Sequence, residues 1–167
     1  MIAPTYLRAM ASYNHWQNEN VYAAAGKLSD AQRKEQRGAF FGSIHATLNH
    51  LLWADQIWMS RFAGTPKPKA ANIPASLDMH ADWADLLRER QVFDQVIIDW
   101  AEHLDPAWLQ SDMTYYSVAI GREVTKPKWL LATHYFNHQT HHRGQVHCLL
   151  TQFGVRPEAT DLPFQPA

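Results

Sequence analysis

Four long segments of this chain carry apolar residues at helical spacing, and this pattern constrains the fold more than any other feature. Each segment repeats apolar side chains every three or four positions, and together they cover about residues 5–26, 42–62, 76–104 and 127–153. They end at Gly26, Gly64, Asp105-Pro106 and Gly154. Four amphipathic helices can share one core only as a bundle. We therefore expect an all-α four-helix bundle, with residues 1–167 forming a single domain.

Two connections between these segments are long. The stretch GTPKPKAANIP (residues 64–74) contains three prolines and predicts a loop after the second helix. The stretch MTYYSVAIGREVT (residues 113–125) is rich in β-forming residues around Gly121 and predicts a small hairpin or an extended loop. We therefore expect long crossovers after the second and third helices. A short polar helix from Ser29 or Asp30 to about Arg37 should follow the first.

Charge and composition exclude several classes of protein. The chain has 15 basic and 16 acidic residues, so nothing in its charge favours nucleic acid or an anionic membrane as a partner. It contains no run of about 18 apolar residues that could span a bilayer. The N-terminus lacks the apolar centre of a signal peptide, so we expect a cytoplasmic protein. With Cys148 as its one cysteine, the chain can form no internal disulfide.

Histidines are concentrated in the fourth helical segment. The chain has ten, and five of them lie between His134 and His147. On a helical wheel that starts at Leu130, His138 lies at about 80° and His142 at about 120°, beside an apolar stripe at roughly 100–160°. His134 and His141 lie on the flank of that stripe, at about 40° and 20°. His138 and His142 are therefore expected to point into the bundle, one turn apart on the same face.

Two inward imidazoles one turn apart are the arrangement by which a helix offers two ligands to one metal ion. The alternative is a pair of core histidines satisfied by hydrogen bonds. Because an unpaired buried polar group costs about 1–3 kcal/mol, a shared metal is the more economical explanation for two such rings. A metal also needs a third ligand, and the second helix offers His45 and His50, which the wheel does not separate. Cys148 lies off the inward face.

Two stretches together resemble the DinB family of small metal-binding four-helix proteins. They are GSIHATLNHLLWADQIWMSRF (residues 42–62) and HYFNHQTHHRGQVHCLLTQFG (residues 134–154), the latter containing Asn137-His138-Gln-Thr-His141-His142-Arg143-Gly144-Gln145. The resemblance implies one divalent metal ion, zinc or nickel, held by His50, His138 and His142. It also implies a homodimer.

Four residues near these motifs allow more than one interpretation. Gly144 suggests a close helix approach, such as a dimer contact, because a mid-helix glycine costs about 1 kcal/mol relative to alanine. Arg143 and Gln145 either orient a ligand or a substrate, or lie on a solvated flank. Asp55 either supports a histidine through a hydrogen bond or pairs with a surface cation.

Three imidazoles leave at least one coordination position for water or a substrate. The resemblance implies a metal-dependent enzyme of the thiol-transferase type, with a low-molecular-weight thiol as its small-molecule partner. Metal-assisted hydrolysis is the second enzymatic hypothesis. The alternatives are a non-catalytic metal-binding stress-response module and a purely structural metal site. For a general base the sequence offers His134, His141 and Glu123 without distinguishing among them.

Overall fold

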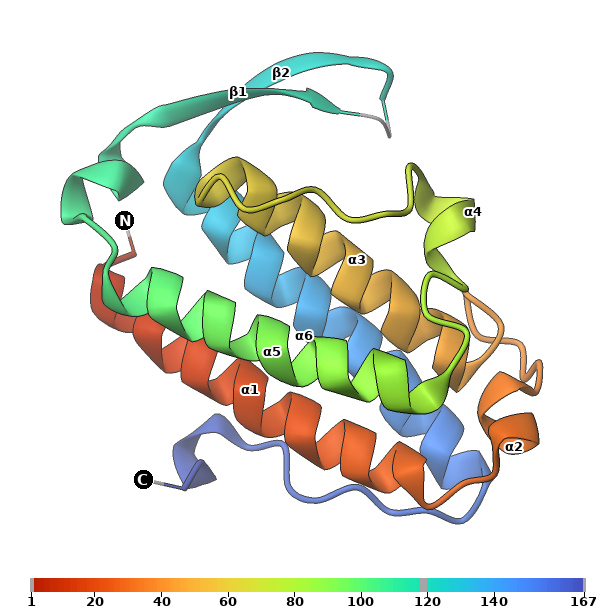
Figure 1. The fold of residues 1–167 in the computed structure, drawn as a ribbon. Coiled ribbons are helices and arrows are strands. Elements are labelled where there is room, and N and C mark those ends of the chain that lie inside the picture. Colours follow the sequence, from red (N-terminus) through yellow and green to blue (C-terminus); the bar gives the residue numbers. More distant parts are fainter. Residues whose placement is uncertain (1, 118–119, 167) are drawn as a thin grey trace.

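The computed structural model describes residues 2–117 and 120–166, and four long helices packed side by side dominate it (Figure 1). Helix α1 contacts α5 and α6, and α3 contacts the same two helices from the other side. The four helices therefore form a closed ring around one core, which confirms the predicted bundle. Their bounds are α1 Pro4–Gly26, α3 Ile44–Phe62, α5 Trp83–Glu102 and α6 Lys128–Gln152.

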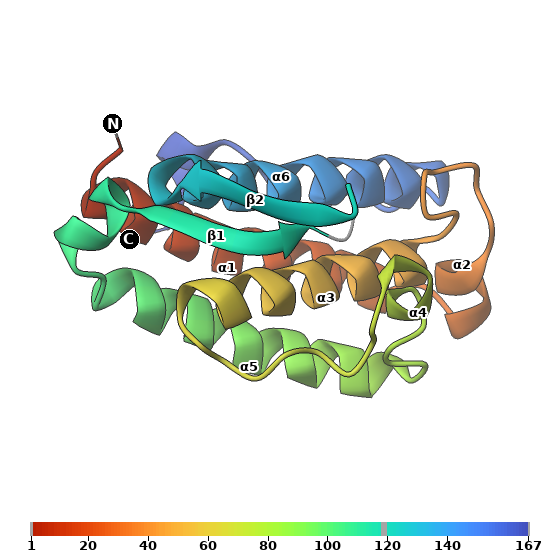
Figure 2. The same cartoon turned by 90° about the horizontal axis from the view of Figure 1, so that it is seen from above.

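The shorter elements all lie in the connections and the C-terminal segment. The predicted hairpin is present: two antiparallel strands pair from Asp112 with Pro127 to Ser117 with Arg122, and they lie over α3 and α6 (Figure 2). Val118 and Ala119 of the predicted segment lie outside the described residues. These elements are α2 Asp30–Lys34, α4 Ile73–Ser76, η1 Pro106–Gln110, β1 Asp112–Ser117, β2 Arg122–Pro127 and η2 Leu162–Phe164.

Helices α3 and α5 run in the same direction, so the chain between them must return along the length of the bundle (Figure 1). This return contains α4, which begins at the capping side chain of Asn72 and ends at Ser76. The prediction that the third long helix starts near residue 76 was wrong. It starts at Trp83, because the Asp82 carboxylate accepts a hydrogen bond from the Asp85 amide and caps that end.

A buried ion pair crosses the centre of the bundle. The Arg90 guanidinium on α5 donates to Asp55 on α3 at 2.6 Å and lies 2.9 Å from the Asp94 carboxylate, and all three side chains are almost fully buried. Gln139 on α6 donates to the second Asp55 oxygen at 2.9 Å. Both predictions for Asp55 were wrong. It forms no hydrogen bond with a histidine side chain in the part of the chain that the structure describes, and its cation is in the core rather than on the surface.

The same polar network continues to α1. Asn18 donates to Asp94 at 2.8 Å, and its amide oxygen lies 3.4 Å from the Arg143 guanidinium of α6. Arg143 also donates to Asn14. The prediction that Arg143 occupies a solvated flank was therefore wrong, since its side chain is buried and bound to α1. Together with the Arg90 ion pair, these contacts form a polar ring that leaves α6 at Gln139, passes through α3, α5 and α1, and returns to α6 at Arg143.

Among the described residues, no helix combines the length and the apolar character that a membrane crossing requires.

Removing Arg90 should strongly destabilise the fold, because two buried carboxylates would then lose their cation. We expect Arg90→Met to lower the free energy of unfolding in urea by about 3–5 kcal/mol. Arg88→Met is the matched control: it removes an exposed arginine from the same helix, paired with Asp85, and should change little. Equal stability of the two variants would show that the buried pair does not stabilise the bundle.

Candidate metal centre

The structure brings His50 of α3 together with His138 and His142 of α6. One ligand nitrogen from each of the three rings lies within 4.8 Å of the other two. The Nε2 atoms of His138 and His142 are 3.1 Å apart, close to the roughly 3.4 Å that separates two nitrogens bound to tetrahedral zinc at about 2.0–2.1 Å. Small side-chain rotations would bring all three within bonding distance of one ion. The residues therefore fit a divalent metal.

Hydrogen bonds from outside the cluster orient two of the imidazoles. Ser76 donates its hydroxyl hydrogen to the Ile73 carbonyl, so the same oxygen is free to accept from His50 Nδ1 at 3.3 Å. Gln145 accepts from His142 Nδ1 at 2.8 Å through its amide oxygen. Each ring then carries its proton on Nδ1 and directs the lone pair of Nε2 into the cluster. This is how neighbouring groups prepare histidines for a metal.

The electrostatics of the cluster keep these rings neutral. Burial and, to a smaller extent, the nearby His142 lower the pKa of His50 to about 4. Burial, followed by the neighbouring histidines, lowers the pKa of His138 to about 3. The pKa of His142 is lowered as well, mainly by burial. A neutral imidazole is the form that binds a metal ion, so burial favours the metal-binding form of all three rings.

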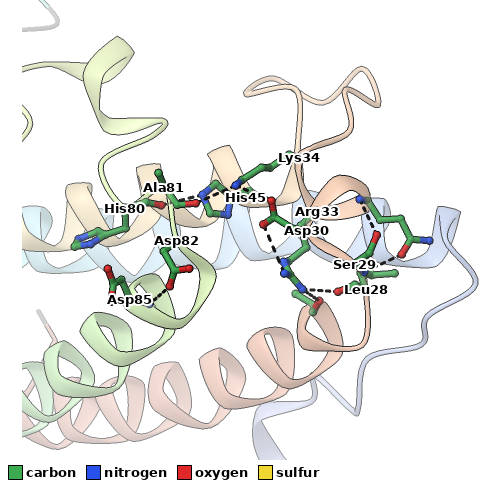
Figure 3. A network of polar contacts seen from close by, with 12 residues as sticks. Leu28, Ser29, Asp30, Arg33, Lys34, His45, His80, Ala81, Asp82 and Asp85 are labelled. Atoms are coloured by element: carbon green, nitrogen blue, oxygen red, sulfur yellow. Dashed lines mark hydrogen bonds and ion pairs between the residues drawn. The ribbon is translucent and has the colours of Figure 1, made fainter.

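The rival ligands lie elsewhere. His45 is buried, but its Nε2 lies 2.9 Å from the His80 carbonyl oxygen, in a polar network that includes Asp30, Lys34 and the Ala81 backbone (Figure 3). The structure thus separates His45 from His50, which the helical wheel could not do. His141 and Cys148, which the wheel places off the inward face, are both exposed.

Helix α6 also places the other two residues of the histidine motif. Gln145 is the orienting residue that one alternative predicted, because it binds His142 and also donates to His141 at 3.2 Å. At Gly144 an added Cβ would meet no described atom within 4 Å beyond its own helix. The prediction that Gly144 allows another helix of the same chain to approach closely is therefore wrong. A contact with a second copy stays a prediction.

Ser76 is the residue of this site that the sequence reasoning missed. It ends α4, in a stretch for which the sequence predicts a loop followed by the start of a long helix. A signal was present: Asn72 followed by Ile73 and Pro74 has the capping side chain and the early proline of a helix start. No local signal, however, predicts that Ser76 lies behind His50, which is 26 residues away in the chain.

The three histidines lie in the wall of a cavity of about 420 Å³. Phe41 covers one side of the cluster, with its ring centroid 4.1 Å from that of His50 and 5.3 Å from that of His142. The remaining walls are mostly aromatic and aliphatic, with His134 and Arg61 among the polar groups. A pocket of this size and character is typical of small-molecule sites.

The lowered histidine pKa values predict that the metal-free protein is destabilised in mild acid. In the unfolded chain these histidines have a pKa of about 6.5, whereas in the folded protein the pKa of His50 is about 4 and that of His138 about 3. As the pH falls below about 6.5, the unfolded chain therefore binds protons that the folded protein does not, and the free energy of unfolding decreases. With a chelator present, the melting temperature should decrease less steeply between pH 7.5 and 4.5 for His138→Ala than for the wild type. His147→Ala is the control on the same helix. Parallel curves for His138→Ala and the wild type would contradict this account.

Comparison with known proteins supports the family resemblance. The sequence matches the DinB family over residues 1–167. It is also 23% identical over 150 residues to Protein DinB of Bacillus subtilis (strain 168), an alignment that covers 89% of this chain and 87% of that protein. Since the family match extends over the whole sequence, including the bundle and the histidine cluster, the chain belongs to the DinB family.

Proposed function

We propose that this protein binds one divalent metal ion, zinc or nickel, through His50, His138 and His142. We further propose that the metal is the centre of an enzyme of the thiol-transferase or hydrolase type. The resemblance to the family favours transfer involving a small thiol, and hydrolysis is the alternative reaction. When bound, such an ion supplies Lewis acidity and stabilises negative charge on a substrate.

The observation that carries this proposal is the open side of the histidine cluster. Among residues 2–117 and 120–166, no other histidine, cysteine, aspartate or glutamate joins the three ligand atoms. The cluster faces a cavity rather than a sealed core. Catalytic zinc sites combine three protein ligands with an open position, whereas structural sites have four protein ligands. The geometry therefore favours an enzyme over a purely structural metal.

His134 is the base that the geometry favours among the three that the sequence offered. It lines the same cavity, and its ring centroid lies 5.8 Å from that of His138 and 5.4 Å from that of Trp58. His141 is bound to Gln145 and does not line the cavity. Glu123 is exposed on β2 and does not line the cavity. We propose that His134 accepts a proton from the substrate or from water.

The ligand set is tested by metal analysis. We expect about one equivalent of zinc or nickel in the untagged wild type by plasma mass spectrometry, and its loss in His50→Ala, His138→Ala and His142→Ala. His134→Ala and His147→Ala are controls from the same helix as two of the ligands, and both should keep the metal. Full occupancy in His142→Ala would refute the assignment. A wild type that binds no divalent ion after incubation would remove the enzyme hypothesis with it.

Turnover is tested separately on the metal-loaded protein. Consumption of a small thiol in the presence of an electrophile, and hydrolysis of small esters, should both be assayed with and without chelator. We expect one of them to require the metal and to fall about 100-fold or more in His134→Ala, which keeps the ion but lacks the proposed base. Metal-independent rates, or no activity in a fully loaded protein, would instead favour the non-catalytic metal-binding module.

A further inference from the structure

The cavity at the histidine cluster also contains a cation. Arg61 lies in the last turn of α3, and its guanidinium carbon is 4.7 Å from the centroid of the Trp58 ring and 4.5 Å from that of Tyr115. The group is thus held against two aromatic side chains, one from the bundle and one from β1. Such stacking fixes a guanidinium in place but leaves its N–H donors free, because the donors lie in the plane of the group.

No carboxylate neutralises this charge. In the described part of the chain, no acidic oxygen lies within 4.0 Å of the Arg61 side-chain nitrogens. Among the described residues, its one hydrogen bond runs from Nη2 to the Tyr116 carbonyl at 3.4 Å, which is long. Burial lowers the pKa of Arg61, and Tyr115 offsets this effect only in part. Arg90, by contrast, lies against two carboxylates. A half-buried guanidinium with unused donors attracts an anion.

The wall between Arg61 and the metal ligands is continuous and largely apolar. Trp58 contacts His134, and His134 contacts His138, with ring centroids 5.4 and 5.8 Å apart. His50 and Arg61 are eleven residues apart on α3, which corresponds to roughly 16 Å along the helix axis. Since Arg61 leans back over Trp58, toward the histidines, the span between its donors and the cluster is shorter than that.

We propose that this cavity binds an elongated amphipathic carboxylate. Its carboxylate pairs with the Arg61 guanidinium, its apolar body lies along Trp58 and Ile57, and its opposite end reaches the three histidines. A planar carboxylate suits the paired donors of arginine, which form two parallel hydrogen bonds with it. The inference rests on the proposed function, because the end of the molecule that reacts is the one at the metal.

Two matched probes test this inference in the cobalt-loaded protein. Both 6-mercaptohexanoate and 6-mercaptohexan-1-ol carry a thiol on a six-carbon chain, and only the first ends in a carboxylate. Binding is followed by the thiolate-to-cobalt absorption band. We expect the wild type to bind the carboxylate about tenfold more tightly, which corresponds to about 1.4 kcal/mol. The proposal further predicts that a shorter probe, 3-mercaptopropanoate, does not reach both ends and shows no such advantage over its alcohol.

Variants assign the preference to Arg61. Arg61→Gln should bind both six-carbon probes equally, while Arg61→Lys keeps the charge without the paired donors and should retain part of the preference. Arg88→Gln is the matched control, since it removes an exposed arginine of α5 that does not line the cavity. Circular dichroism melting checks the fold of each variant, and Arg61→Lys carries the test if Arg61→Gln does not fold.

Cobalt content measured on the same samples separates the two proposals. One equivalent of cobalt with equal affinity for both probes in the wild type would overturn the role of Arg61 and leave the metal site intact. An undiminished preference in Arg61→Gln would do the same. Absence of cobalt from the wild type would overturn the metal site, and this inference with it.

Discussion

The rest of the structure depends on the polar ring that passes through the centre of the bundle. Removing these groups from water is costly, and the ring offsets that cost only when every helix has the right rotation and height. Gln139 and Arg143 belong to the ring, and each directly follows a histidine of the candidate metal centre. The contacts that fix the rotation of α6 in the core therefore also direct His138 and His142 toward α3. Fold and site share one geometric constraint.

Much of this arrangement could be predicted from the sequence because the spacing of apolar residues repeats along each helix. Helical periodicity located the four long helices, and the wheel identified the inward pair on α6. The choice between His45 and His50 could not be made this way, since both are buried on α3 and differ only in what faces them. Family resemblance favoured His50, and the tertiary packing agrees: His45 faces the His80 backbone, whereas His50 faces α6.

Contacts between distant segments could not be predicted. Asp55 and Arg90 are 35 residues apart, and nothing near either residue indicates that they meet in the core rather than at the surface. The start of α5 illustrates a related limit. Ser76, Asp78 and Asp82 can all cap a helix, and local chemistry does not rank them. In the folded chain Ser76 ends α4 with its hydroxyl beside His50, and Asp82 is the residue that caps the long helix.

The hairpin adds a second layer to the molecule. It is outside the four-helix ring, yet it supplies Tyr115 and Ser117 to the lining of the cavity. Surface connections tolerate insertions and substitutions far better than a packed core does. Evolution can therefore reshape this part of the lining while the histidines and the polar ring stay unchanged. The hairpin is thus the part of the cavity lining that can change most freely without disturbing the residues that hold the bundle together.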